Sequence, residues 1–181
     1  MSNDVEILRI RIADIKSRIT SLSTAIETRL EIILADYFTN SFEDYQLFCH
    51  LFYPFDIELT FGKKIKIFEK FLNKVYPEYL KQNPDFINSL IRVKKIRNKF
   101  AHSINPKKSD LEKVIDKSYF ILFYMEDGLP KEEEIPWKYI EERFEDFKSI
   151  EGEAIKIYDH VKPEKKSASQ DSTQQDSEQR S

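Results

Sequence analysis

The chain has 181 residues, a formal net charge of −3 and 40% apolar residues, which suits one folded domain followed by a tail. Three glycines are too few for a Gly-rich phosphate loop or a turn-dense all-β fold, and one cysteine, Cys49, excludes an intramolecular disulfide framework. No apolar run is long enough for a membrane span, and the N-terminus lacks the apolar segment of a signal peptide. We therefore expect a cytoplasmic protein without a membrane segment.

The first predicted element is a long helix over about residues 4–38. Its apolar residues recur at alternating spacings of three and four, at Leu8, Ile12, Ile15, Ile19, Leu22, Ile26, Leu30, Ile33 and Tyr37. This heptad-like stripe predicts packing against another helix. Two interpretations of the first half stay open, a dimerisation arm that extends beyond the domain and an ordinary bundle helix. Glu27 and Glu31 border the core, where they either pair with a buried cation or remain solvated.

Two shorter helices are predicted next. The aromatic segment 42–52 favours a short helix in which Cys49 and His50 are packing residues. Thr60 is placed to cap a helix from residue 61 to about 75. Lys63 and Lys64 lie in its first turn, where the helix dipole disfavours cations, so these side chains either meet an acidic partner or RNA phosphates, or remain solvated.

The most informative element is a helix over about residues 84–102, with Asn83 as its N-cap and Pro84 in its first turn. One face is apolar and consists of Phe86, Leu90, Val93, Phe100 and Ile104. Arg97 projects from the middle of that face and needs a carboxylate, a carbonyl cluster or an anion as a partner. Asn98 and His102, four residues apart, share a neighbouring strip. Five cations and no anion lie between residues 92 and 99, at Arg92, Lys94, Lys95, Arg97 and Lys99.

The C-terminal third mixes element types. We predict a short helix over 109–116, a strand over 119–125 and a weaker return strand near 132–135, joined through Asp127-Gly128. A helix over 111–126 is the alternative. A last helix follows from about residue 136 to 160, and the polar segment 163–181 is predicted to be a disordered tail.

The residues around Arg97 suit phosphate chemistry without a metal. The three histidines are scattered, so no metal or cofactor site is predicted. RNA is cleaved without metal when its own 2′-OH attacks the adjacent phosphodiester, a reaction that needs a base, an acid and a cation. His102 titrates near neutral pH and suits the acid or base role. A guanidinium such as that of Arg97 forks onto two phosphate oxygens.

The segment IRNKFAHS, which contains Arg97-Asn98-x-x-x-His102, resembles the signature of the HEPN superfamily. The upstream Phe61-Gly62-x-Lys64-Ile65 segment resembles one branch that includes relatives of the mannitol-operon repressor. The resemblance covers roughly residues 20–105. It implies an all-helical homodimer, and many such domains are metal-independent endoribonucleases of toxin–antitoxin and antiphage systems, whereas others are inactive binding modules.

By this resemblance two motifs meet across the dimer. His102 would be the acid or base, Arg97 the phosphate clamp, and Asn98 would orient the histidine or the phosphate. Glu27 and Glu31 would support Arg97. The expected contacts to RNA are Lys94, Lys95, Lys99, Lys63 and Lys64.

Two other interpretations stay open. In the structural one, Arg97 is an ion-pair pivot with Glu27 or Glu31, and the side chain of His102 caps the helix. The protein would then be a non-catalytic dimeric module that binds an antitoxin or another partner protein. A transcriptional regulator is less favoured, because no helix-turn-helix with a basic recognition helix is evident. In every case the predicted fold is all-α, a bundle of five to six helices over residues 1–162, with a small β-hairpin before the last helix.

Overall fold

The computed structural model describes residues 2–39, 43, 46, 60–115 and 117–161. Within them are six helices and a three-stranded antiparallel sheet. The elements are α1 (Ser2–Phe38), α3 (Phe61–Val75), α4 (Pro77–Gln82), α5 (Phe86–Ala101), β1 (Ser103–Ile104), α6 (Lys108–Glu112), β2 (Tyr119–Glu126), β3 (Leu129–Pro136) and α7 (Trp137–Val161). The mainly helical architecture and the hairpin before the last helix are confirmed. The predictions for the 42–52 helix and for the 163–181 tail lie outside the described residues.

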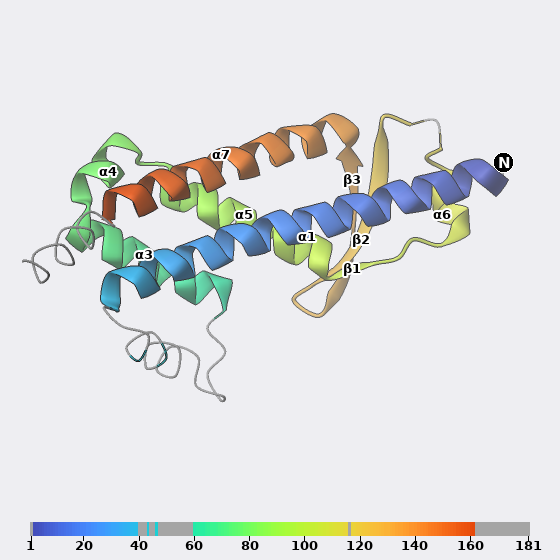
Figure 1. Ribbon diagram of the computed structural model, residues 1–181. Coiled ribbons are helices and arrows are strands. Elements are labelled where there is room, and N and C mark those ends of the chain that lie inside the picture. The colour runs from blue at the N-terminus through green and yellow to red at the C-terminus, as the bar shows by residue number, and fades with distance from the viewer. Residues whose placement is uncertain (1, 40–42, 44–45, 47–59, 116, 162–181) are drawn as a thin grey trace, which may run out of the picture.

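The long helix α1 belongs to the bundle along its whole length. Its buried apolar stripe begins at Val5 and reaches Leu34. α7 runs beside α1 in the same direction (Figure 1), as three contacts show: Arg11 over the Trp137 ring, Arg18 over the Phe144 ring, and the Tyr158 hydroxyl donating to Asp36. The first half of α1 is therefore an ordinary bundle helix and not a free dimerisation arm. Tyr37, predicted within the stripe, is 44% exposed.

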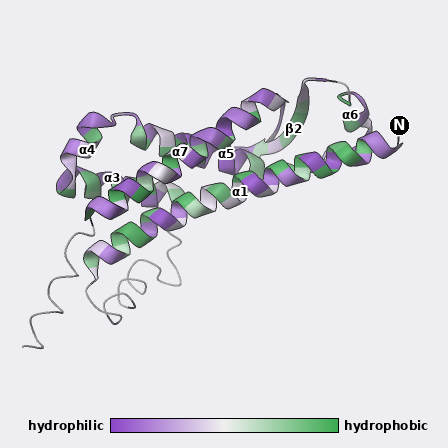
Figure 2. Ribbon diagram, turned by 45° about the horizontal axis from the view of Figure 1, so that its top comes forward, coloured by the Kyte–Doolittle hydropathy of each residue, from purple (hydrophilic) through white to green (hydrophobic). Residues whose placement is uncertain are grey.

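Figure 2 shows hydrophobic and hydrophilic residues interleaved along α1 and α7, as amphipathic helices require. In the part of the chain that the structure describes, no helix has both the length and the apolar character needed to cross a membrane.

The motif helix α5 packs against α1, α3 and α7. Phe86, Leu90, Val93 and Phe100 are buried, as its apolar periodicity predicts. Its start differs from the prediction, because residues 77–82 form a helix of their own with Pro77 in its first turn. Asn83 consequently ends α4, and Asp85 is the N-cap of α5.

The other end of α5 leads directly into the sheet. Ile104, predicted on the apolar helix face, instead belongs to β1, where it pairs with Phe123 of β2 and is 52% exposed. The short strand follows His102 without a loop, so the sheet fixes the direction in which the chain leaves the motif helix.

The hairpin confirms the strand prediction and excludes the alternative helix over 111–126. Alternate residues of β2, Phe120, Leu122 and Tyr124, are buried, whereas β3 is mostly exposed. Asp127 and Gly128 both have positive φ, 51° and 78°, as a type I′ turn requires. The helix predicted over 109–116 is shorter, since α6 ends at Glu112.

Candidate functional site

Arg97 lies where α5 meets α1, with 32% of its side chain exposed. Its Nη2 atom is 3.7 Å from Oε2 of Glu27, close enough for an ion pair but beyond hydrogen-bond distance. Its Nε atom is buried and has no hydrogen-bond partner among the described residues. The guanidinium is thus placed by an opposite charge and makes no hydrogen bond to the described residues.

Glu27 has a closer partner in Lys64 of α3. The Lys64 Nζ atom donates to Oε1 of Glu27 at 2.7 Å and to Oε1 of Glu31 at 2.5 Å. Burial alone would lower the pKa of Lys64, but hydrogen bonds to the two carboxylates outweigh it and raise the pKa above its ordinary value. This Glu27–Lys64–Glu31 cluster joins α1 to α3 beside Arg97. Lys64 therefore acts inside the bundle, and an RNA contact by Lys64 stays a prediction.

Asn98 and His102 lie on the surface at the C-terminal end of α5. The backbone N–H of His102 donates to the Asn98 carbonyl at 3.0 Å, so His102 occupies the C-cap position. No hydrogen bond to its imidazole is found among the described residues.

Other groups satisfy the carbonyls near His102. The Ser103 hydroxyl donates to the Phe100 carbonyl at 2.7 Å, and the Lys16 Nζ atom donates to the Ser103 carbonyl at 3.0 Å. The predicted capping role of the His102 side chain is therefore taken by Ser103, while Lys16 of α1 bonds the first residue of β1. Sequence reasoning missed Lys16, because the contact joins residues 87 positions apart.

A polar strip follows from this arrangement. Lys94, Asn98 and His102 are spaced four residues apart and share one side of α5, with Arg97 next to Asn98. Lys94 lies over the start of α3, since a Cβ atom at Gly62 would come within 3.3 Å of the Lys94 Nζ atom. The neighbouring Lys63 is exposed. We call Lys94, Arg97, Asn98 and His102 the motif strip.

The remaining predicted RNA contacts lie elsewhere. Lys95 and Lys99 are on the side of α5 that faces α7 and β3. Lys99 pairs with Glu133 at 2.5 Å, and the Tyr124 hydroxyl donates to the same carboxylate at 3.1 Å. Burial would lower the pKa of Lys99, but this pairing raises it. The predicted basic surface is thus divided between two sides of α5.

The motif strip offers an imidazole for proton transfer and cations for phosphate oxygens. Within the described ranges, no group of three His, Cys, Asp or Glu side chains is arranged to hold a metal ion. Comparisons of the chain with family models, curated proteins and solved structures found no match.

Proposed function

We propose that the protein is a HEPN-type, metal-independent endoribonuclease that acts in the cytoplasm as a homodimer, within a toxin–antitoxin or antiphage system. One observation supports this proposal most. His102 is exposed with an imidazole that makes no hydrogen bond to the described residues, while Arg97, five residues earlier on α5, is one-third exposed and is held by the charge of Glu27 without a hydrogen bond. A residue that served only to stabilise a helix end would be engaged with that end, as Ser103 is.

The reaction assigns each member of the motif strip a role. The 2′-oxygen of RNA attacks the adjacent phosphorus and the bond from phosphorus to the 5′-oxygen breaks, leaving a 2′,3′-cyclic phosphate and a 5′-hydroxyl. His102 takes the proton of the 2′-OH or supplies the proton of the leaving 5′-oxygen. Arg97 binds the non-bridging oxygens, where negative charge grows in the transition state. Lys94 attracts the phosphate, and Asn98 orients it or the imidazole.

One chain supplies a single histidine at this position, whereas the reaction uses both a base and an acid. A two-fold dimer that brings two motif strips together completes the set. His102 and Ile104 are both exposed at the same end of α5, so this end is accessible to a second copy.

The proposal is tested by inducible expression of the wild type, His102→Ala and Arg97→Ala, with growth recorded and total RNA separated on a gel. The wild type is expected to arrest growth and fragment RNA, and both variants are expected to do neither. His160→Ala is the matched control, because that histidine stacks on Tyr76 at the far end of α7. Each variant must be soluble and have the oligomeric state of the wild type. Equal toxicity of wild type and His102→Ala would contradict the proposal.

A non-catalytic dimeric interaction module is the second candidate, and the Glu27–Lys64–Glu31 cluster favours it. Arg97 extends this cluster to α5, as expected of a pivot that holds three helices together. The exposed acidic residues of β3, Glu132 and Glu134, offer a surface to a basic partner protein. Absence of toxicity and of RNA cleavage in the soluble, dimeric wild type would favour this second function.

A further inference from the structure

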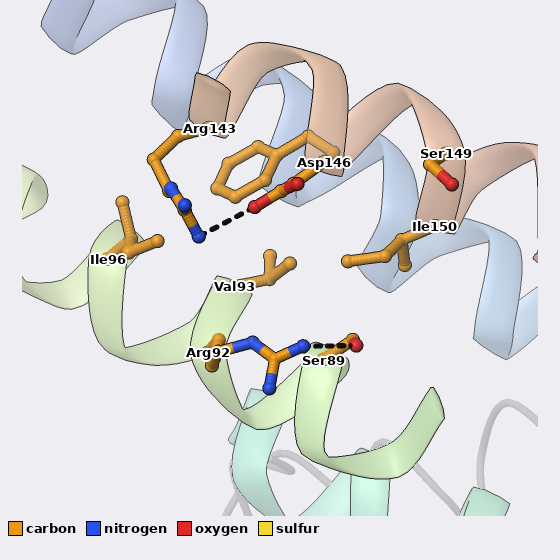
Figure 3. Close-up of a pocket in the computed structure, with 9 residues that line it drawn as sticks. Ser89, Arg92, Val93, Ile96, Arg143, Asp146, Ser149 and Ile150 are labelled. Atoms are coloured by element: carbon orange, nitrogen blue, oxygen red, sulfur yellow. Dashed lines mark hydrogen bonds and ion pairs between the residues drawn. The ribbon is translucent and has the colours of Figure 1, made fainter. Parts of the chain in front are cut away.

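A groove borders the side of α5 that carries Arg92 and Ile96. Side chains two positions apart on a helix point in directions that differ by about 200°. Arg92 and Ile96 therefore point away from Lys94, and Ile96 points away from Asn98. Two adjacent pockets lie between α5 and α7, with volumes of about 110 Å³ and 190 Å³. Both are lined by Arg92, Ile96 and Arg143, which makes them two parts of one groove. Figure 3 shows the smaller part, with Arg92 reaching in from α5 and Arg143 from α7.

The larger part of the groove is strongly cationic. Arg92, Lys95, Lys99 and Arg143 line it, and no carboxylate is among its lining residues. Lys99 is compensated by Glu133, and Arg143 by Asp146, which lies 2.6 Å from its Nη1 atom, and by Glu142, which lies 3.9 Å from its Nη2 atom. Arg92 donates to the Ser89 hydroxyl at 2.7 Å, and neither Arg92 nor Lys95 has an ion-pair partner among the described residues. These neighbouring cations repel one another and attract an anion, so an anion bound here would be stabilised.

Arg143 lines both parts of the groove and has one donor without a partner among the described residues. Its Nε atom is buried and has no hydrogen-bond partner in the described part of the chain. Its guanidinium lies over the Tyr139 ring, 4.9 Å from the ring centroid. This contact holds the guanidinium of Arg143 across the groove from Arg92 (Figure 3). Two guanidinium forks and two ammonium groups suit an anion with several oxygens, such as a phosphate, better than a single carboxylate.

The floor of the same part is apolar. Phe100 and Ile135 are buried there, and Ile96 and Tyr139 are half-buried. Such a surface suits a flat ring, which stacks on an aromatic side chain while its charged substituent stays at the cationic rim. A volume of 190 Å³ is below the roughly 300–1,000 Å³ of pockets for drug-sized ligands, so one compact ring system fits better than a large cofactor.

We propose that this groove binds a nucleoside monophosphate unit, with the phosphate held by Arg92, Lys95 and Arg143 and the base packed on Tyr139 and Ile135. The unit is either a free nucleotide or one nucleotide of an RNA strand. The proposal does not rest on the endoribonuclease activity, because His102 is not among the residues that line the groove. His102→Ala is expected to abolish cleavage and to retain this binding, so either proposal can fail without the other.

Isothermal titration calorimetry of the full chain tests the proposal, with AMP, GMP, CMP and UMP each titrated separately. The matching nucleosides, ribose 5-phosphate and inorganic phosphate show whether base and phosphate are both needed. A 2′-O-methylated single-stranded hexanucleotide, which cannot undergo attack by its own 2′-oxygen, tests the RNA source. The variants are Arg92→Gln with Lys95→Gln, and Tyr139→Leu. Lys70→Gln with Lys74→Gln is the matched control, since it removes two exposed charges from α3.

At least one monophosphate is expected to bind ten times more tightly than its nucleoside, ribose 5-phosphate and phosphate. We expect the Arg92/Lys95 variant to weaken this binding at least tenfold, Tyr139→Leu about fivefold, and the control less than twofold. Groove-dependent binding of the hexanucleotide alone would also support the site and identify RNA as the source. Three results would overturn the proposal: no binding of any monophosphate or of the hexanucleotide, equal loss in the control, or phosphate alone binding as tightly as the monophosphate.

Discussion

The guanidinium of Arg97 and the carboxylate of Glu27 are 3.7 Å apart, while the other oxygen of that carboxylate accepts a hydrogen bond from Lys64 at 2.7 Å. Lys64 is thus the stronger partner of Glu27, and Arg97 is positioned by charge without a hydrogen bond. The sequence leaves both a structural role and a phosphate-binding role open for Arg97, and this geometry assigns the structural role mainly to Glu27 and Lys64. Glu27 and Lys64 hold α1 and α3 together, and Arg97 is one-third exposed beside them.

Glu27→Gln is expected to destabilise the fold more than Glu31→Gln. Glu27 is 12% exposed and faces two cations, so its neutralisation should lower the free energy of unfolding by about 3 kcal/mol. Glu31 is 28% exposed, and its observed ion pair is with Lys64 alone, so about 1 kcal/mol is expected. Urea denaturation of both variants measures the difference. Equal losses would contradict the central place given to Glu27.

Arg97→Met is expected to separate stability from activity. Because the guanidinium is one-third exposed and its ion pair is long, the loss of stability should be about 1 kcal/mol or less. RNA cleavage should fall by about 100-fold or more, as when one donor to a transition-state anion is removed. Denaturation and cleavage rates are measured on the same preparation. A large loss of stability with unchanged cleavage would assign Arg97 to the scaffold.

The pH dependence of stability should reveal the Lys64 cluster. The pKa of Lys64 in the folded chain is raised above its ordinary value of 10.5. Its stabilising contribution is therefore fully present below pH 10.5 and is lost as the pH rises through the raised pKa. The destabilisation caused by Lys64→Met should be constant between about pH 7 and pH 10 and should shrink above that range.

Thermal unfolding of wild type and Lys64→Met across this pH range gives that difference directly. Lys63→Met is the control, because Lys63 is exposed in the same turn of α3. A Lys64→Met effect that already declines between about pH 6 and pH 8 would assign the contribution to a different titrating group.

Ile12→Ala and Ile10→Ala should differ strongly, although they are two residues apart on α1. Ile12 is 8% exposed within the bundle, whereas Ile10 is 61% exposed. We expect Ile12→Ala to lower the free energy of unfolding by about 2–4 kcal/mol through the cavity that it leaves. Ile10→Ala should change it by less than about 0.5 kcal/mol. Similar small effects of both substitutions would mean that the first half of α1 does not pack in solution.

Local patterns predicted most of the helices and the hairpin. The apolar periodicity of α5, the alternation in β2 and the Asp127-Gly128 turn each reflect neighbours a few residues apart. The same patterns gave the wrong N-cap for α5, because Pro77 starts a separate helix that takes Asn83 as its end. They also left Ile104 on the helix, because the pairing with Phe123 in β2 joins distant segments.

In the candidate site, too, local spacing could be predicted from the sequence, whereas contacts between distant segments could not. The spacing of Lys94, Asn98 and His102 could be read from the sequence, since it follows from helix geometry. The choice of Lys64 over Arg97 as the close partner of Glu27 depends on how three helices pack, which no local pattern contains. For the same reason, the groove between α5 and α7 and the contact from Lys16 to Ser103 became visible only in the structure.

The central claim is tested most directly by cleavage of a defined single-stranded RNA with the purified chain in EDTA. The wild type is expected to release fragments ending in a 2′,3′-cyclic phosphate, and a 2′-deoxy substitution at the cleaved position should block the reaction. His102→Ala should reduce the rate at least 100-fold, while His160→Ala should leave it unchanged. No cleavage by the wild type, or equal cleavage by His102→Ala, would contradict the endoribonuclease account.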